Sequence, residues 1–314
     1  MSDKLKLSII IPMYNEEESI TESLNKVRDA FSEKFNLELV LVDDGSKDKT
    51  LEIIKALKSL TPLVQIKTVE LSRNFGQSTA ILAGLNFAEG DLVGIMDADL
   101  QDPPEIMNAM IKLLLKEDVD VVYGVRKRRH GESSLKRLLA WGFYRSLNLI
   151  SQTPIPEDTG EFRVMKSMVT KALLQSNEHD PYVRGLVAWI GFKQMPYFFE
   201  RPGRVAGETK YKLRQQLELA TRAITSFSSA PLRLGVWVGI FGILFGVSLS
   251  LWSVYSWYMG GAVRGWSSLI AITALMNSIG FILTGINGMY VGRIYNETKN
   301  RPRYIVRNVK KTLF

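Results

Sequence analysis

Short apolar runs and amphipathic segments alternate along the first 126 residues of the chain. The apolar runs are nearly continuous in Val, Ile and Leu, which is typical of strands that are buried on both faces. Strands of this kind that alternate with helices indicate a parallel sheet covered by helices. We therefore predict an α/β domain with strands at residues 5–12, 37–44, 65–71, 91–97 and 119–125.

Two longer apolar runs lie near the C-terminus. Residues 234–259 and 267–291 contain no charged residue, and each run exceeds the ~20 residues that a helix needs to cross a bilayer core. The short connector predicts a transmembrane hairpin, with a pair of buried helices in a soluble protein as the alternative. Lys and Arg are concentrated on both flanks, whereas the turn carries one, Arg264. This distribution places both flanks in the cytoplasm.

The segment before the hairpin has the pattern of an amphipathic helix. Leu213, Leu217, Ala220 and Ile224 fall on one helical face, as expected for a helix on the membrane surface. A helix packed on the soluble domain is the alternative. We expect a soluble domain at 1–210, a juxtamembrane helix at 211–231, transmembrane helices at 232–259 and 267–291, and a basic cytoplasmic tail at 292–314.

The composition narrows the chemistry. The chain has 314 residues, a formal net charge of +8 and no cysteine, so disulfides and thiolate catalysis are excluded. It has only two histidines, His130 and His179, which gives little support to a histidine-rich metal site or a Ser-His-Asp triad. The charge suits an anionic partner such as a membrane surface or a phosphorylated substrate. The sequence carries no nucleic-acid recognition module, so we expect no nucleic-acid partner.

The stretch MDADLQDPPE, residues 96–105, ends a predicted strand in a cluster of carboxylates. Asp97 and Asp99 are two residues apart, so both can reach one Mg²⁺ or Mn²⁺ ion if the strand turns there, and Gln101 adds a neutral oxygen. A metal held in this way can bridge a diphosphate and stabilise it as a leaving group. Turn and cap chemistry is the alternative. It suits Asp102, which precedes two prolines and is expected to be a helix N-cap.

Two other predicted strands end in the polar clusters PMYNE and VDDGS. Ligands of parallel α/β sheets bind beyond the carboxyl ends of the strands, where these clusters lie. In the second cluster, Asp44 is favoured over Asp43 as an acceptor of hydrogen bonds from a uracil or ribose, with an Asx turn as the alternative. The first cluster is not G-x-G-x-x-G, so a dinucleotide site is poorly supported.

Six motifs in a fixed order resemble those of a known enzyme family. PMYNEEE, VDDGSKDKT, LSRNFGQ, MDADLQDPPE, DTGEFRVM and RVAGETK follow one another as in family-2 glycosyltransferases of the polyisoprenyl-phosphate subgroup. The hairpin and the closing YVGRIYNETKNRPRY come after them. Within this subgroup the chain resembles bactoprenol glucosyltransferases and dolichyl-phosphate-mannose-synthase-like enzymes. The resemblance implies a GT-A fold over residues 1–210, which is a Rossmann-like, mostly parallel sheet with flanking helices.

The resemblance also implies roles for individual residues. Arginine offers a planar donor fork to phosphate oxygens and lysine a point charge, which suits three positions that would meet donor or acceptor phosphates: Arg126, Arg204 and Lys210. Arg126 opens the run RKRRH, whose alternative role is a solvated face against anionic lipid. Metal and nucleotide-sugar would be held by Pro12, Tyr14, Glu16, Val42, Asp44, Asp97, Ala98, Asp99 and Gln101, with Asp97, Asp99 and Gln101 as the metal ligands.

A second acid cluster, EDTGEFRVM at residues 157–165, corresponds to the acceptor side in the family. Relatives often carry aspartate at the position of Glu161, so either Glu161, which we favour by position, or Asp158 would act as a base or orient the attacking group. Arg163 could pair with either carboxylate. A strong base is not required, because a phosphate oxygen is already anionic near neutral pH. A second departure is Met289, where relatives often carry glutamate.

The resemblance implies an inverting, metal-dependent transfer of a hexose, with glucose favoured, from a UDP-sugar to undecaprenyl phosphate. Asp99, Glu161 and Asp158 would be the catalytic residues. The enzyme would be a multi-pass protein of the bacterial inner membrane, with its catalytic domain and both termini in the cytoplasm. It would form a homo-oligomer, with a tetramer as one option. Two alternatives stay open: a processive polysaccharide synthase, although the sequence lacks Q-x-x-R-W, and a catalytically silent membrane scaffold.

Overall fold

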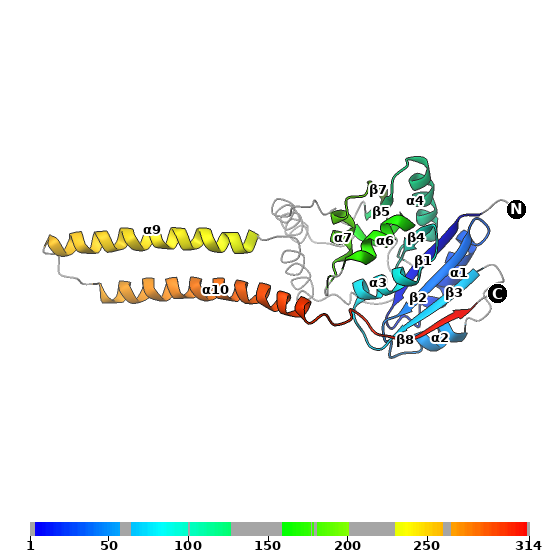
Figure 1. Cartoon of the computed structure of the whole chain (residues 1–314), viewed down its shortest axis with the longest axis horizontal. Coiled ribbons are helices and arrows are strands. Elements are labelled where there is room, and N and C mark those ends of the chain that lie inside the picture. The colour runs from blue at the N-terminus through cyan, green and yellow to red at the C-terminus, as the bar shows by residue number, and fades with distance from the viewer. Residues whose placement is uncertain are drawn as a thin grey trace. The chain divides into compact units, whose positions relative to one another are not determined.

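The computed structural model describes residues 4–56, 64–99, 101–126, 159–176, 178, 181–200, 230–259 and 265–312. The chain divides into two compact units. One unit contains Met1–Ala223 together with Arg301–Phe314, and the other contains Ile224–Asn300. Figure 1 shows the sheet and helices of the first unit and the two long helices of the second.

A single eight-stranded sheet forms the centre of the first unit (Figure 1). Its strands are β1 (Lys6–Met13), β2 (Asn36–Asp43), β3 (Val64–Leu71), β4 (Leu92–Ile95), β5 (Val121–Arg126), β6 (Thr159–Lys166), β7 (Gln194–Phe199) and β8 (Val306–Thr312). They lie in the order β7-β5-β6-β4-β1-β2-β3-β8. The four neighbours β4-β1-β2-β3 are parallel. β6 runs antiparallel to β4 and β5, and β8 runs antiparallel to β3.

The α/β fold with a mostly parallel central sheet is confirmed. β1 to β5 lie where the five apolar runs predicted strands, and β1, β2 and β3 are buried along almost their whole length. The fourth run was expected to stay extended to residue 97, but β4 ends at Ile95. One more backbone bond follows, from the Met96 amide to the Ile10 carbonyl at 3.1 Å. The chain then leaves the sheet with the carboxylate cluster at its end.

Helices cover both faces of the sheet. In α1, the residues Ile20, Leu24, Val27 and Phe31 recur at helical spacing and are all buried, as an amphipathic helix on a core requires. They join one hydrophobic cluster with β1 residues such as Leu7 and with α4. The helices of this unit within the described residues are α1 (Ile20–Phe31), α2 (Thr50–Ala56), α3 (Gln77–Phe87), α4 (Pro104–Lys116), α6 (Ser167–Gln175) and α7 (Val183–Trp189).

The other face of the sheet is packed against α3, which approaches β1 and β2 closely. Gly84 makes this approach feasible. A Cβ atom at Gly84 would overlap the Cγ2 methyl group of Ile10 and lie 3.0 Å from that of Val42. The absence of a side chain at this position therefore lets α3 lie against the strands whose ends carry the polar clusters.

A buried charged cluster lies at the amino ends of the central strands. Glu38 of β2 is completely buried, and its carboxylate accepts hydrogen bonds from the Ser8 hydroxyl group and, at 2.8 Å, from the Glu89 amide. Lys67 of β3 lies 2.8 Å from Glu38 and 2.6 Å from the Glu89 carboxylate. Lys6 of β1 also pairs with both acids. Each buried charge is thus matched by an opposite one, as burial demands.

The C-terminal segment departs from the sequence expectation. Residues 292–314 were assigned to a basic tail outside the soluble domain, but Val306–Thr312 form β8 and pair with β3. Ser72 donates its amide to the Ile305 carbonyl at 2.9 Å, just ahead of this pairing. Arg307 and Lys311 of β8 lie 3.5 Å from Glu70 and Glu89. The basic residues that suggested a tail thus include two that pair β8 with acidic side chains, Glu70 of β3 and Glu89 of the segment before β4.

The second unit contains two long helices, α9 (Ala230–Tyr258) and α10 (Trp266–Thr298) (Figure 1). α10 extends seven residues beyond the end that its apolar run predicted. Many large apolar side chains of these helices are exposed, among them Trp237, Phe241 and Phe281. Within the residues that the structure describes, no helix is both long enough and apolar enough to span a membrane. The predicted juxtamembrane helix lies outside the described residues up to residue 229, and α9 begins at its end.

Candidate active site

The polar clusters that end the central strands come together at one edge of the sheet. β1, β2 and β4 are parallel and adjacent, so the segments that follow Met13, Asp43 and Ile95 lie side by side. The Asp44 amide donates to the Met13 carbonyl at 2.9 Å, which continues the pairing of β1 and β2 beyond their ends. This edge is where the sequence predicted a ligand site.

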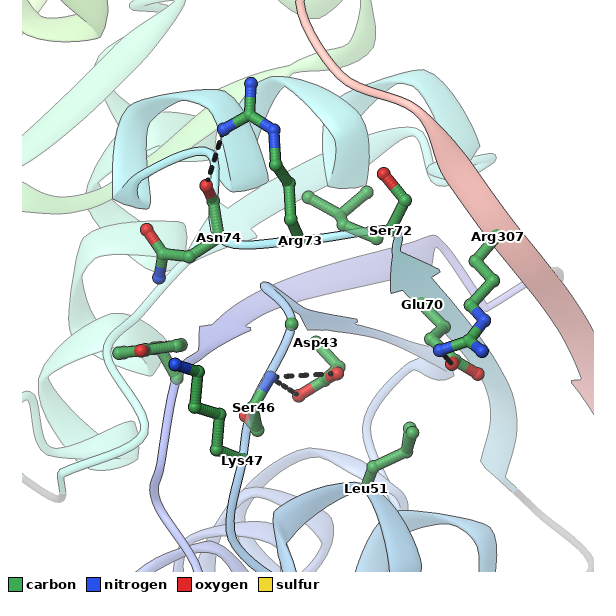
Figure 2. A pocket seen from close by; sticks show the side chains of 12 residues that line it. Asp43, Ser46, Lys47, Leu51, Glu70, Ser72, Arg73, Asn74 and Arg307 are labelled. Atoms are coloured by element: carbon green, nitrogen blue, oxygen red, sulfur yellow. Dashed lines mark hydrogen bonds and ion pairs between the residues drawn. The ribbon is translucent and has the colours of Figure 1, made fainter.

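A cavity of about 470 Å³ opens at this edge, beyond the ends of β2 and β3. Figure 2 shows its labelled side chains, with Lys47 on one side and Glu70 and Arg307 on the other. Tyr14 of the PMYNE cluster, predicted to bind the nucleotide, is among the lining residues. The cavity is lined by Tyr14, Asp43, Gly45, Ser46, Lys47, Leu51, Glu70, Leu71, Ser72, Arg73, Asn74 and Arg307.

The two aspartates of VDDGS have different surroundings. Asp43 lines the cavity and accepts a hydrogen bond from the Ser46 amide, at 3.3 Å and 3.4 Å to its two oxygens. Burial, with a contribution from the Glu70 charge, raises the pKa of the Asp43 carboxyl group. Asp44 accepts hydrogen bonds from the amides of Phe75 and Gly76 at 2.7 Å and 2.8 Å. Burial raises the pKa of Asp44 despite these bonds. Asp43 thus faces the cavity, whereas Asp44 anchors the loop between β3 and α3.

Gly45 of VDDGS lies where this segment approaches the loop between β3 and α3. Its φ of +70° lies in the left-handed region, and a Cβ atom there would be 2.6 Å from the carbonyl carbon of Arg73. Only glycine fits such a backbone approach without strain. The VDDGS loop therefore packs directly against the loop that follows β3, and residues of both loops line the cavity.

The PMYNE cluster is held by Ser46 and by residues that follow it. Asn15 has a φ of 56°, and its amide donates to the Ser46 hydroxyl group at 3.1 Å. Its side-chain oxygen accepts from the Lys47 amide at 2.8 Å. The Glu16 amide donates to the Thr50 hydroxyl group at 2.8 Å. The other two predicted nucleotide-binding residues in this region are Pro12 and Val42. They lie opposite each other in the β1–β2 register and are buried in the sheet.

The carboxylate cluster after β4 contains the predicted metal ligands. Asp97 accepts a hydrogen bond from the Gln77 side chain at 2.7 Å, and Asp99 accepts one from the Gln101 amide at 3.1 Å. Ala98, between them, is buried. Asp102 was expected to cap α4, but the N-cap is Pro103 without a side-chain hydrogen bond. The Asp102 carboxylate instead accepts from the Asp97 amide at 3.4 Å, because the two prolines begin the helix after the chain has turned.

The donor set suits a hard divalent cation that is shared with a phosphate ligand. Among the described residues, no group of three or more His, Cys, Asp or Glu side chains could hold a metal by itself. Mg²⁺ is typically held by one or two carboxylates together with substrate phosphates. Asp97 and Asp99, with the Gln101 oxygen, match that kind of incomplete site.

Glu161 of β6 is the centre of an arginine clamp. β6 lies next to β4 in the sheet, and the register pairs Ile95, the last residue of β4, with Arg163. Glu161 is buried, and its carboxylate oxygens lie 3.1 Å from Arg163 Nη2 and 2.9 Å from Arg184 Nε. Arg184, from α7, also donates to the Thr159 carbonyl at 2.7 Å.

Arg163 was expected to pair with an acid of its cluster, and it does so with Glu161. Sequence reasoning missed several other residues. Arg184, Glu70 and Arg307 carried no signal, because their partners come from distant parts of the chain. Gln77, Arg73 and Asn74 stood in the motif LSRNFGQ without an assigned role. Three predicted residues, Asp158, Arg204 and Lys210, lie outside the described residues, as does the side chain of Arg126 at the end of β5.

Comparison with known protein families assigns most of this unit. Residues 8–174 match the family model described as "Glycosyl transferase family 2". The chain belongs to glycosyltransferase family 2. This match runs from β1 to α6 and therefore includes the carboxylate cluster and Glu161 of the transferase.

Relatives of this glycosyltransferase match it over almost its full length. It is 42% identical to the uncharacterized glycosyltransferase YkcC of Bacillus subtilis, over 98% of this chain and 94% of that protein. It is 36% identical to the bactoprenol glucosyl transferase of Shigella phage SfV, over 98% of this chain and 100% of that protein. A solved structure of glucosyl-3-phosphoglycerate synthase from Mycobacterium tuberculosis, in complex with Mn²⁺ and UDP, is 19% identical with a TM-score of 0.46, over 70% of this chain and 78% of that one.

Proposed function

We propose that this glycosyltransferase transfers a hexose, with glucose favoured, from a UDP-sugar to undecaprenyl phosphate, the phosphorylated form of bactoprenol. One observation carries the proposal. The similarity to a bactoprenol glucosyl transferase covers 98% of this chain and all of the relative, so it includes the helical hairpin and β8 as well as the family-2 region. An apolar hairpin would keep the active site beside the membrane, where the phosphate of a lipid acceptor lies.

The donor side of the proposed site is the cavity together with the cluster after β4. The nucleoside would lie against Tyr14 and the loops that Asp44 and Glu16 fix, over the strand ends at Pro12 and Val42. Asp97 and Asp99, with the Gln101 side chain, would hold Mg²⁺ or Mn²⁺ with the diphosphate beside Ala98. When bound, this ion would neutralise charge that develops on the departing UDP.

The acceptor side would lie toward Glu161. A phosphate oxygen of the lipid attacks the anomeric carbon, the bond from that carbon to the UDP oxygen breaks, and its electron pair leaves with UDP. A single displacement of this kind inverts the anomeric centre. Because Glu161 is held by two guanidinium groups, we assign it a positioning role. Arg126, Arg204, Lys210 and Asp158 complete the proposed acceptor site.

We further propose that residues 232–259 and 267–291 anchor the transferase in the bacterial inner membrane, with the catalytic domain and both termini in the cytoplasm. Two observations support this proposal. Residues 234–259 and 267–291 contain no charged residue, and many apolar side chains of α9 and α10 are exposed. The proposed enzyme assembles as a homo-oligomer. Its basic flanks would attract anionic headgroups and the phosphate of the acceptor.

The test is a transfer assay with the purified full-length protein in detergent. Undecaprenyl phosphate is supplied with a panel of UDP-sugars, and Mg²⁺ or Mn²⁺ is compared with a chelator. We expect glycolipid from one UDP-hexose, in the presence of the metal only. Consumption of no donor in any combination, while the protein remains folded and monodisperse, would overturn the proposal.

A further inference from the structure

The C-terminal strand supplies one end of the cavity. Arg307 of β8 lies 3.5 Å from the Glu70 carboxylate, which also pairs with Lys55 at 3.1 Å. The Glu70 side chain is only 9% exposed, whereas that of Arg307 is 71% exposed. Figure 2 shows both at the same side of the cavity, opposite Lys47. Glu70 therefore holds one part of the guanidinium group and leaves its remaining N–H donors accessible.

The charges of the lining constrain what can bind at this end. Asp43 and Glu70 are paired in the β2–β3 register and are both buried. Two adjacent carboxylates repel a phosphate, so the interior of this end favours a neutral, hydrogen-bonding part of a ligand. The cationic side chains, Lys47, Arg73 and Arg307, come from three different segments around the cavity.

The strand order sets the distances along the carboxyl edge of the sheet. Neighbouring strands lie ~4.8 Å apart, so β3 is roughly 14 Å from β4, with β1 and β2 between them. A nucleotide whose diphosphate lies beside Asp97 and Asp99, after β4, therefore extends its base toward β2 and β3. That is the end of the cavity where Glu70 and Arg307 lie.

We propose that Arg307 reads the donor base: its guanidinium group donates a hydrogen bond to the uracil carbonyl oxygen that cytosine replaces by an amino group, and Glu70 positions it. This inference rests on the UDP-sugar donor of the proposed function and adds a specificity residue from outside the family-2 region. An arginine has only donors. It therefore favours the carbonyl of uracil and disfavours the amino group that cytosine presents at the same place.

The test is equilibrium binding of UDP, UMP and CDP to the full-length protein in detergent with Mg²⁺, by titration calorimetry at ~0.15 M salt. Arg307→Ala is compared with wild type and with Lys310→Ala. Lys310 is exposed on the same strand and makes no ion pair with any described residue, so this control removes the same charge. Equal melting temperatures of the three unliganded proteins establish that the fold is intact.

We expect Arg307→Ala to weaken UDP binding on the order of tenfold, which corresponds to about 1.4 kcal/mol. The affinity for UMP should fall by the same factor, and the ratio of UDP affinity to CDP affinity should decrease. The UDP affinity of Lys310→Ala should stay within twofold of that of wild type. An unchanged UDP-to-CDP ratio in Arg307→Ala would overturn the inference. A larger loss for UDP than for UMP would also overturn it, because the contact would then be to phosphate.

These binding measurements separate the inference from the proposed reaction. If Arg307→Ala loses the base preference while the wild-type protein makes no glycolipid, the base-reading role stands and the proposed acceptor fails. If the wild-type protein makes glycolipid while the UDP-to-CDP ratio is the same in Arg307→Ala, the reaction stands and the role of Arg307 fails.

Discussion

Asp97 and Asp99 follow the same strand but have different hydrogen-bond partners. The Asp97 carboxylate is oriented by the side chain of Gln77, and the Asp99 carboxylate by the backbone of Gln101. A backbone amide fixes the turn itself, so Asp99 depends on local geometry alone. Asp97 depends also on the position of α3. Both are thereby oriented before any ion arrives, which is what a shared metal–diphosphate site needs.

We predict that Asp99→Asn lowers the metal-dependent transfer rate by at least about a hundredfold, since the loss of a metal ligand removes several kcal/mol of transition-state stabilisation. The measurement is the initial rate of glycolipid formation at saturating Mg²⁺. Asp29→Asn is the matched control, because Asp29 is exposed on α1 and pairs only with its neighbour Arg28 among the described residues. A rate for Asp99→Asn that equals the control would contradict the assigned role.

Glu161 illustrates how a carboxylate near a reaction centre can serve to position other groups. We predict that Glu161→Gln lowers kcat on the order of tenfold or more and raises the KM for undecaprenyl phosphate, because Arg163 and Arg184 lose their shared counter-charge. The KM for the UDP-sugar should stay within about twofold. Arg184→Lys should retain more activity than Arg184→Ala, since it keeps the charge.

The pH profile of kcat/KM distinguishes positioning from base catalysis. For a positioning residue, Glu161→Gln scales the whole profile down and leaves its acid limb in place. Disappearance of the acid limb in this variant would instead identify Glu161 as the general base.

At the residue scale, the sequence identifies site residues that lie close to one another along the chain. The spacing of Asp97 and Asp99 after an apolar strand is enough to predict their proximity. Arg184, Glu70 and Arg307 could not be found in this way, because they meet their partners only when α7 and β8 are in place. Asp44 was preferred over Asp43 by its motif, and only the structure distinguishes the carboxylate that faces the cavity from the one that fixes a loop.

At the scale of elements, the clearest contrast lies between the two ends of the central strands. At the carboxyl end of β2, burial raises the pKa values of Asp43 and Asp44, whereas the amino ends carry a cluster in which opposite charges are paired. Burial alone would raise the pKa of Glu38 and lower that of Lys67, but their mutual hydrogen bond and charge shift both in the opposite direction. In Glu89, hydrogen bonds from Lys67 and Lys6 lower the pKa from 4.5 to about 2.

This cluster predicts a pH dependence of stability. A carboxyl group whose folded pKa is depressed stabilises the fold above its unfolded pKa, and this contribution is lost as the group is protonated. For Glu89 the loss runs from pH 4.5 down to about 2. We predict that the melting temperature of Glu89→Gln falls less steeply than that of wild type across this window.

The control for this measurement is Glu33→Gln, since Glu33 is exposed and its carboxylate makes no ion pair within the described chain. Its melting curve should follow wild type at every pH. The raised pKa values of Asp43 and Asp44 act in the opposite direction, but they are common to all three proteins and cancel in the comparison. A wild-type slope in Glu89→Gln would contradict the prediction.

Prediction of the elements from sequence worked where buried strands are rich in Val, Ile and Leu. β1 to β5 are of that kind, although β2 and β3 also carry the buried charges of Glu38 and Lys67. β8 reads VRNVKKT, and its charges suggested a solvated tail, although Arg307 and Lys311 pair with Glu70 and Glu89. β7 has a partly exposed pattern, as an edge strand allows, and therefore lacks the continuous apolar signal.

At the scale of the whole molecule, the chain leaves the sheet unit, forms the helical pair and returns. A protein truncated after residue 223 therefore lacks β8 as well as the helices. We predict that it melts lower and binds UDP more weakly than a version in which residues 224–300 are replaced by a flexible Gly/Ser linker that retains 301–314. The measurements are thermal melting and UDP titration in the same buffer. Equal melting temperatures and affinities for the two shortened proteins would contradict a structural role for β8.

The return of the chain also sets an order of events during synthesis. Until β8 is in place, the outer edge of β3 offers unpaired backbone groups, which are a template for intermolecular pairing, and β8 follows the helical pair in the chain. The sheet is completed only after the whole apolar hairpin has been translated. Premature termination between the helical pair and β8 would thus release a product with an unpaired β3 edge, and aggregation of that product is the expected result.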